Sequence, residues 1–218
     1  MSATTSSELN RATAHLAQVD DVLAALLDSG ADPDPFHGES PVPAEKRFAS
    51  MVLHIIGQQI SIRVAEVIFG RLEAALGAPP TPEGVLKLGP EALRPLGMSQ
   101  AKASYLVDLA QRESDGRLSL TEIHAYSDDE ALTRLTAVRG IGLWSAQMFL
   151  LHQLQRPDIF PAGDVGLRKA VQRAWSLADV PSIKQVEQRA VAWSPYRTYA
   201  AALLWRSGGH LGGHQDDI

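Results

Sequence analysis

Cysteine is absent from the 218 residues of the sequence. Its absence excludes disulfides, zinc sites built on thiolates and iron-sulfur clusters ligated by cysteine. Long hydrophobic runs are also missing: apolar stretches such as 51–56 and 148–151 fall far short of the roughly 20 residues that cross a bilayer, so no membrane span is expected. The N-terminus has no basic segment followed by an apolar core, which predicts no secretory signal and a cytoplasmic location.

Positive charge is scarce overall, because the net charge is -5 at pH 7. The acidic residues are concentrated in the first 50 positions, whereas residues 160–218 carry a small excess of basic side chains. A local basic patch, not the total charge, decides whether phosphates bind. A nucleic-acid partner is therefore compatible with this composition.

Helical periodicity dominates the chain, and no run of alternating apolar and polar residues predicts a sheet, so we expect an all-α fold. A first helix is predicted at 9–28, followed by a loop rich in Pro, Gly and Asp at 29–43. Ser127 and Glu130 fit a capping box that opens a helix at 128–138. The other predicted helices span 44–57, 61–76, 81–87, 90–94, 99–113, 143–155, 165–177, 183–192 and 196–207. The tail at 208–218 is predicted to be disordered.

The stretch LTAVRGIGLWSAQMFLLHQ, residues 135–153, places Gly140-Ile141-Gly142 between two apolar helical patterns. Glycine tolerates positive φ and leaves backbone amides unobstructed, and the isoleucine can plug a small core within the hairpin. The free amides at the start of the second helix, at its positive dipole end, suit one phosphate oxygen. An ordinary helix-helix turn with a glycine cap explains the same residues.

Three further motifs stand in order around this hairpin. PAGDVGLRKA places Pro161 and Asp164 19 and 22 positions after Gly142, HIIGQQIS lies upstream, and WSPYRTYAAALLW lies downstream. Together the four motifs resemble the helix-hairpin-helix, Gly/Pro-Asp superfamily of DNA glycosylases and, within it, the DNA-3-methyladenine glycosylase II (AlkA-type) branch. The resemblance covers roughly residues 44–207, and four ordered motifs are more specific than any single one.

The resemblance implies that Asp164 is the catalytic carboxylate. Cleavage between a base and deoxyribose C1′ develops oxocarbenium character on the sugar, and a nearby anion stabilises it. At ~4 Å and an effective dielectric constant of about 20 the attraction is on the order of 4 kcal/mol, roughly a thousandfold in rate. The carboxylate can also orient or deprotonate the attacking water. The alternative role is a helix N-cap before Val165, and the two roles are compatible because helix amides favour the ionised form.

The resemblance also implies a base pocket formed by Trp144, Met148 and Trp205. Relatives that cut the DNA strand carry lysine at the position of Trp144, so tryptophan there implies a monofunctional enzyme that uses water. Its ring can stack on a flipped, electron-poor base, with a cation-π component when the base is alkylated. Gln59 falls where the family places the wedge that fills the gap left by the flipped nucleotide. As alternatives, both tryptophans can be core residues and Gln59 an ordinary loop residue.

Binding of the DNA backbone is expected from the hairpin and from the basic side chains nearest to it. The residues expected to contact DNA are Gly140, Ile141, Gly142, Arg139, Arg168 and Lys169. Lys102 is a weaker candidate, and each basic residue can instead be a solvated surface charge. The resemblance allows a structural monovalent cation held by the backbone of Thr136, Val138 and Ile141. No other cofactor is implied.

Two helical subdomains with a cleft between them are expected. One comprises residues 44–151 with the helix-hairpin-helix at about 128–155, and the other combines 1–43 with 152–218. The expected function is a monofunctional base excision repair glycosylase that hydrolyses the N-glycosidic bond of flipped-out alkylated purines of the 3-methyladenine type. Its expected partner is double-stranded DNA carrying such bases, and the chain is expected to be a monomer with no obligate protein partner. The alternatives are a non-catalytic helix-hairpin-helix DNA-binding module or a protein-interaction scaffold, neither of which needs Asp164.

Overall fold

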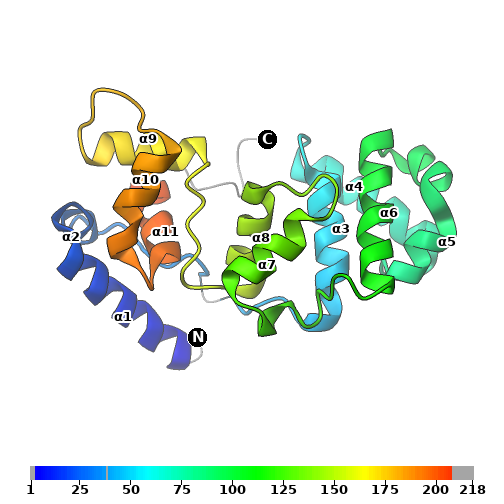
Figure 1. Ribbon diagram of the computed structural model, residues 1–218, viewed down its shortest axis with the longest axis horizontal. Helices are drawn as coiled ribbons and strands as arrows, with labels where there is room; N and C mark the ends of the chain where they lie inside the picture. The colour runs from blue at the N-terminus through cyan, green and yellow to red at the C-terminus, as the bar shows by residue number, and fades with distance from the viewer. Residues whose placement is uncertain (1–2, 38, 208–218) are drawn as a thin grey trace. The chain divides into compact units, whose positions relative to one another are not determined.

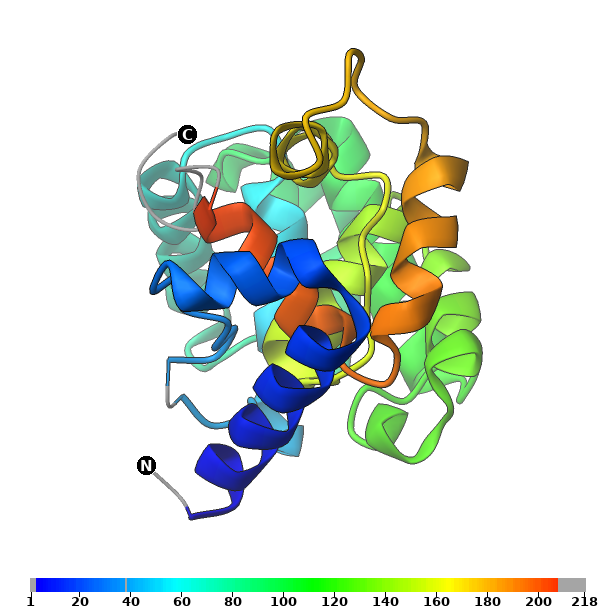
Figure 2. The ribbon, with the colours of Figure 1, turned by 90° about the vertical axis from the view of Figure 1, so that its left-hand side faces the viewer.

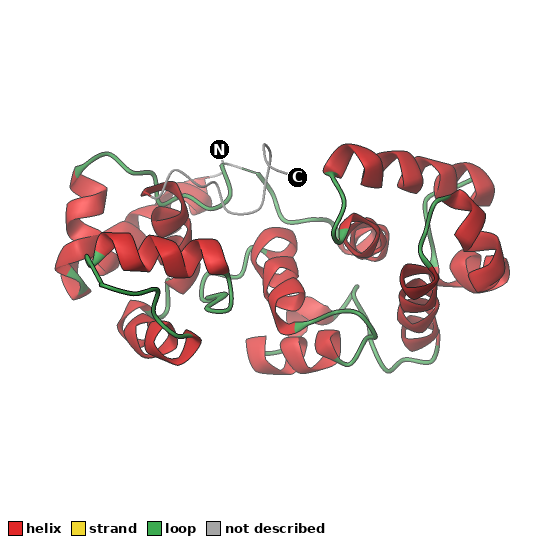
Figure 3. Cartoon of the chain, turned by 90° about the horizontal axis from the view of Figure 1, so that it is seen from above, coloured by secondary structure: helices red, strands yellow, loops and turns green. Residues whose placement is uncertain are grey.

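The computed structural model describes residues 3–37 and 39–207, and every regular element within these ranges is a helix (Figure 1). No strand occurs in the described ranges (Figure 3), which confirms the predicted all-α class. None of the described helices is long and apolar enough to cross a membrane. The tail at 208–218, predicted to be disordered, lies outside the described residues.

The helices follow one another with short connections. The α-helices are α1 (Ala3–Val19), α2 (Asp21–Asp28), α3 (Arg47–Gly57), α4 (Ile62–Leu76), α5 (Pro82–Leu93), α6 (Gln100–Ser114), α7 (Asp128–Thr136), α8 (Leu143–Leu154), α9 (Val165–Ala174), α10 (Ile183–Ala190) and α11 (Arg197–Ser207). The 3₁₀ helices are η1 (Ala44–Lys46), η2 (Arg94–Leu96), η3 (Ile123–Ala125) and η4 (Val191–Trp193).

Two compact units divide the described chain. The terminal unit comprises residues 3–37, 39–41 and 147–207, and the central unit comprises residues 42–146. Helix α8 therefore begins in the central unit and continues into the terminal unit.

Helix α11 supplies the middle of the terminal unit, because all its residues from Thr198 to Trp205 are buried. Helices α1, α2 and α9 pack against it, and Figure 2 shows α1 and α2 in blue alongside α11 in orange and red. Trp193, which is fully buried, stacks on Trp175 with ring centroids 5.8 Å apart. Burial of such large aromatic surfaces is a major stabilising contribution in a unit of this size.

The single helix predicted at 9–28 is wrong, because the chain breaks at Asp20. Asp20 has extended φ and ψ (-151° and 111°), and its side chain accepts hydrogen bonds from the N–H groups of Val22 and Leu23. An aspartate in this position caps a new helix, which allows α2 to change direction from α1. The indole N–H of Trp193 donates to the other carboxylate oxygen of Asp20 at 3.0 Å, so the break is fixed from the core.

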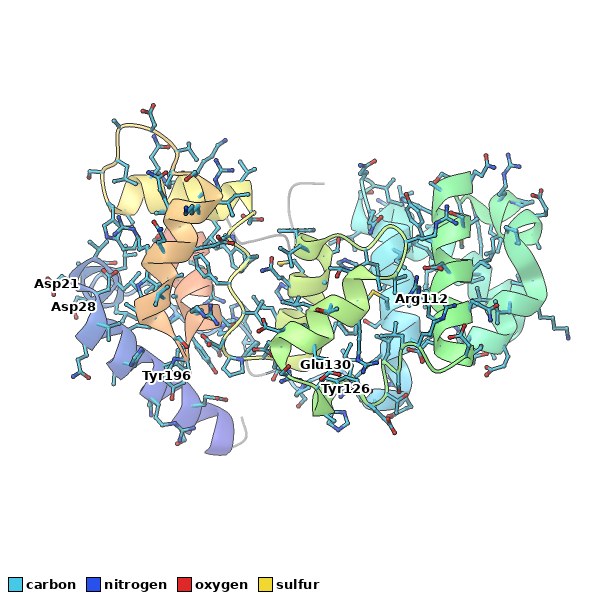
Figure 4. The ribbon with its side chains drawn as sticks, viewed as in Figure 1. Asp21, Asp28, Arg112, Tyr126, Glu130 and Tyr196 are labelled. Atoms are coloured by element: carbon cyan, nitrogen blue, oxygen red, sulfur yellow. The ribbon has the colours of Figure 1, made fainter. Side chains whose placement is uncertain are left out.

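In the central unit, α6 packs against α5 and α3, and α3 packs against α4. Helix α7 begins as predicted, with Ser127 Oγ accepting the N–H of Glu130. The reciprocal half of the expected capping box is replaced by an ion pair, since Arg134 one turn later donates to the Glu130 carboxylate at 2.8 Å. Arg134 also covers the ring of Tyr126, which is labelled beside Glu130 in Figure 4.

Candidate active site and DNA-binding elements

The hairpin between α7 and α8 depends on glycine at one of its two glycine positions. Gly140 has a φ of +80°, and a Cβ added there would come closer than 3.0 Å to three carbons of the Tyr105 ring. Gly142 has no positive φ, and an added Cβ would meet nothing within 4 Å. Ile141 between them is 3% exposed and plugs the hairpin as expected. Steric necessity thus explains Gly140, whereas Gly142 leaves open space at the start of α8.

Helix α6 supports the hairpin through Asp108. One oxygen of this carboxylate accepts the backbone N–H of Arg139 at 2.9 Å and the Nε–H of Arg112, labelled in Figure 4, also at 2.9 Å. Burial opposes ionisation of Asp108, but these donors outweigh it and hold the pKa of the carboxyl below its ordinary value. The carboxylate therefore stays charged and holds the hairpin backbone at neutral pH.

The turn after α3 carries the expected wedge residue in an unusual conformation. Gln59 is exposed and has a φ of +59°, a left-handed conformation that non-glycine residues seldom adopt. The preceding Gln58 donates its side-chain amide to the carbonyl of Gly140 at 3.0 Å. The turn that presents Gln59 is thus joined directly to the hairpin.

Asp164 caps helix α9. Pro161 to Asp164 form a turn in which the Asp164 N–H donates to the Pro161 carbonyl at 2.8 Å, and Asp164 Oδ1 accepts the N–H of Leu167 at 2.7 Å. The indole N–H of Trp205 donates to the same oxygen at 3.2 Å. A Cβ added at Gly166 would lie 3.1 Å from this oxygen. The half-buried carboxylate is therefore held in one place by two elements of the terminal unit.

The three predicted pocket residues differ in burial. Trp205 and Met148 are each 5% exposed in the terminal unit, whereas Trp144 belongs to the central unit and is 42% exposed. The core role considered for Trp144 does not match this exposure. Trp205 is a core residue whose indole N–H also donates to Asp164, and its role in a base pocket stays a prediction.

The predicted basic contacts divide into exposed and engaged side chains. Arg139 and Lys169 are exposed. The Nε–H of Arg168 donates to the carbonyl of Pro181 at 2.8 Å, and the ammonium of Lys102 donates to the carbonyl of Ile56 at 2.7 Å. Burial lowers the pKa of Lys102. Lys102 thus binds the C-terminal end of α3, a role that the sequence alone did not indicate.

A monovalent cation at the hairpin would be held by backbone carbonyl oxygens. The carbonyl of Val138 accepts the N–H of Ile141 at 3.1 Å, which leaves one lone pair of that oxygen for another partner. Neutral carbonyl oxygens suit a hard monovalent ion. No group of three or more His, Cys, Asp or Glu within the described ranges could hold a metal ion.

Nothing in the sequence pointed to Asp108 and Tyr105 as supports of the hairpin. Gln58 lies in the GQQIS motif and carried a weak signal through its neighbour Gln59. Tyr105 and Asp108 are three apart on a predicted helix, which places them on one face, but nothing in their spacing indicates the hairpin as their partner.

Known proteins and structures match this chain over most of its length. A family model described as "HhH-GPD superfamily base excision DNA repair protein" matches residues 52–195. The Bacillus subtilis protein YfjP is 35% identical over 164 residues, which cover 72% of this chain but 57% of YfjP. A crystal structure of the DNA-3-methyladenine glycosidase of Bacillus halodurans has a TM-score of 0.76 and 32% identity, covering 89% of this chain and 87% of that one. The Schizosaccharomyces pombe 3-methyladenine DNA glycosylase Mag1, solved in complex with abasic DNA, has a TM-score of 0.74 and 26% identity, covering 94% and 100%.

Proposed function

The chain belongs to the HhH-GPD superfamily of base excision DNA repair proteins, and we propose that it is a monofunctional DNA glycosylase for alkylated purines of the 3-methyladenine type. It hydrolyses the bond between the extruded base and deoxyribose C1′, and it leaves free base and an abasic site. The names of the relatives above point to this substrate class.

The main support for the proposal is the fixed position of the Asp164 carboxylate. Two N–H groups, from Leu167 and Trp205, fix one of its oxygens. A fixed anion beside the sugar stabilises the oxocarbenium character that develops as the bond to the base breaks, without reorganisation during the reaction. It also orients the water that adds to C1′. An alkylated purine carries a positive charge before cleavage and leaves as a neutral base, so the reaction does not require a second carboxyl group as acid.

The exposed indole of Trp144 supplies the other half of the chemistry. An aromatic face stacks on any purine and binds a positively charged one more strongly through the cation-π component. Tryptophan has no amine with which to form a Schiff base, so water is the nucleophile and the strand is not cut. In this proposal Met148 and Trp205, both in the terminal unit, also contact the base.

DNA is held by the hairpin in this proposal. The amides at the start of α8, beside the open space at Gly142, bind a phosphate oxygen. The backbone carbonyls of Thr136, Val138 and Ile141 would hold a monovalent cation, which would add positive charge at this site. Arg139, Arg168 and Lys169 add positive charge along the duplex. Gln59 enters the stack where the damaged nucleotide leaves it. The enzyme acts as a monomer on chromosomal DNA, in the cytoplasm and at the nucleoid if the cell is bacterial.

Release of free bases from randomly methylated duplex DNA, resolved by chromatography, tests the proposal. Asparagine caps helices as well as aspartate, so Asp164→Asn keeps the fold but removes the charge. We expect base release to fall by about a thousandfold or more, from on the order of 4 kcal/mol of lost electrostatic stabilisation. Asp179→Asn, at an exposed aspartate of the same unit, serves as the matched control and keeps full activity. If the wild type binds DNA but releases no base, the chain is a binding module and the proposal fails.

A further inference from the structure

Three side chains on one face of α6 each hold a different piece of backbone in the central unit. Lys102, Tyr105 and Asp108 are spaced by three residues and so project from the same side of the helix. Lys102 reaches the end of α3, whereas Tyr105 and Asp108 reach the hairpin. One rigid helix face therefore touches both the turn that presents Gln59 and the element proposed to grip DNA.

The contact with α3 fixes the start of the Gln59 turn. The Lys102 ammonium lies 2.7 Å from the Ile56 carbonyl, one of the last carbonyls of the helix, which have no partner within it. A cation is favourable at this negative end of the helix dipole. The contact between the Lys102 ammonium and the Ile56 carbonyl is partly buried, and this burial lowers the pKa of Lys102.

The contacts with the hairpin fix the backbone on either side of its left-handed glycine. The ring of Tyr105 packs so closely on Gly140 that no side chain fits there, and Asp108 accepts the N–H of Arg139. Gln58 links the turn to the hairpin, because its side-chain amide donates a hydrogen bond to the Gly140 carbonyl. The left-handed Gln59 follows directly after Gln58.

We propose that a clamp formed by Lys102, Tyr105 and Asp108 on α6, together with Gln58, fixes the Gln59 turn against the helix-hairpin-helix. When the hairpin binds the DNA backbone, the clamp therefore also places Gln59 in the base stack. The inference rests on the proposed function, because it concerns how the same site extrudes a base. These four are positioning residues. In the clamp, Lys102 holds protein backbone and is not a phosphate anchor.

The test separates gripping from extrusion by binding alone. Affinity for an undamaged duplex measures binding of the DNA backbone. Insertion of Gln59 is measured by a ratio: the affinity for a duplex that carries a tetrahydrofuran abasic analogue divided by the affinity for the undamaged duplex. The fluorescence of 2-aminopurine placed beside the analogue rises when its stacking is disrupted and reports the same step. The variants are Gln58→Ala and Lys102→Met, which removes the ammonium but keeps most of the stem. Gln188→Ala, at an exposed glutamine of α10, is the matched control.

We expect Gln58→Ala and Lys102→Met each to lower the affinity ratio by about 10-fold and to reduce the fluorescence rise. Binding to undamaged duplex and its salt dependence stay as in the wild type, because no phosphate contact is removed. Asp108→Asn keeps an oxygen acceptor for the Arg139 N–H and retains most of the ratio, whereas Asp108→Ala does not. Tyr105→Phe keeps the ring and behaves as the wild type.

Two results overturn the clamp. An unchanged ratio in Gln58→Ala shows that the turn is placed without it. Weaker binding of Lys102→Met to every duplex, with the slope of log affinity against log salt reduced by about one, makes Lys102 a phosphate anchor. Base release by the wild type reports the proposed function separately, so release with unchanged ratios rejects the clamp and leaves the glycosylase assignment standing.

Discussion

Replacing Gly140 by alanine is expected to destabilise the central unit by about 2–5 kcal/mol. Two costs add up at this position. A non-glycine residue held at a φ of +80° costs roughly 1–2 kcal/mol, and forcing a methyl group into packed atoms costs roughly 1–3 kcal/mol more. The overlap involves ring carbons of Tyr105, a half-buried side chain, so the ring or the hairpin backbone must shift to admit the methyl group.

Urea denaturation followed by far-ultraviolet circular dichroism measures this loss, and a double-mutant cycle isolates its steric part. In a Tyr105→Ala background the methyl group meets no ring, so Gly140→Ala should cost only the backbone strain. The coupling energy between the two positions is then about 1–3 kcal/mol. Gly140→Ala with wild-type stability, or a cycle with no coupling, refutes the steric account of this glycine.

Gly142→Ala is the matched control within the same hairpin. Its added methyl group meets no atom within 4 Å and its φ is not positive, so the free energy of unfolding should change by less than about 0.5 kcal/mol. A methyl group in the space proposed for a phosphate should nevertheless weaken binding to undamaged duplex. Loss of stability in place of loss of DNA affinity would assign Gly142 to folding.

Three further outcomes are expected. Gly166→Ala should lower single-turnover base release by about 10-fold, because the added methyl group lies 3.1 Å from Asp164 Oδ1 and displaces it. Stability should not fall, because alanine improves helix propensity by about 1 kcal/mol. An unchanged rate of base release contradicts this expectation. Trp144→Ala should change stability by less than about 1 kcal/mol, since the side chain is 42% exposed, but reduce base release by at least about 10-fold through lost stacking; a large drop in the denaturation midpoint instead would return Trp144 to a structural role. Burial opposes ionisation of Asp158, but Arg197 and its other hydrogen-bond donors outweigh burial and hold the pKa of the carboxyl below 3.8. As the pH falls, the unfolded chain therefore takes up the proton first. The contribution of Asp158 to stability is intact above pH 3.8 and is lost as the pH falls through the folded-state pKa. Asp158→Asn should therefore flatten the acid limb of a stability-pH curve, and an unchanged limb rejects the assignment.

Helix starts were predictable because their signals are local. Ser61, Thr81, Ser99 and Ser127 each precede an apolar helical pattern, and each accepts an N–H of the first turn. Asp20 carries the same signal, but it lies within a continuous apolar periodicity, and the periodicity alone predicted one helix in place of two. The cap prevailed because the core residue Trp193 holds Asp20 from a position far along the chain.

The candidate site was predictable only in part. The motifs located Asp164, the hairpin and Gln59, since each is a short stretch of adjacent residues. The side chains that hold them come from other helices: Trp205 lies 41 residues after Asp164, and Asp108 lies 31 residues before Arg139. Such pairs are created by helix packing, and a single sequence contains no spacing rule that predicts them.

The two interpretations of Asp164 are separable because the helix cap does not require a charge. Asparagine or serine at this position would accept the Leu167 N–H equally well. The Trp205 indole would likewise find an acceptor in an amide or hydroxyl oxygen. The helix cap by itself is therefore compatible with an uncharged side chain at this half-buried position. A proposed reaction that places positive charge on a sugar supplies the reason to retain a carboxylate there, and the same hydrogen bonds then serve both the helix and the chemistry.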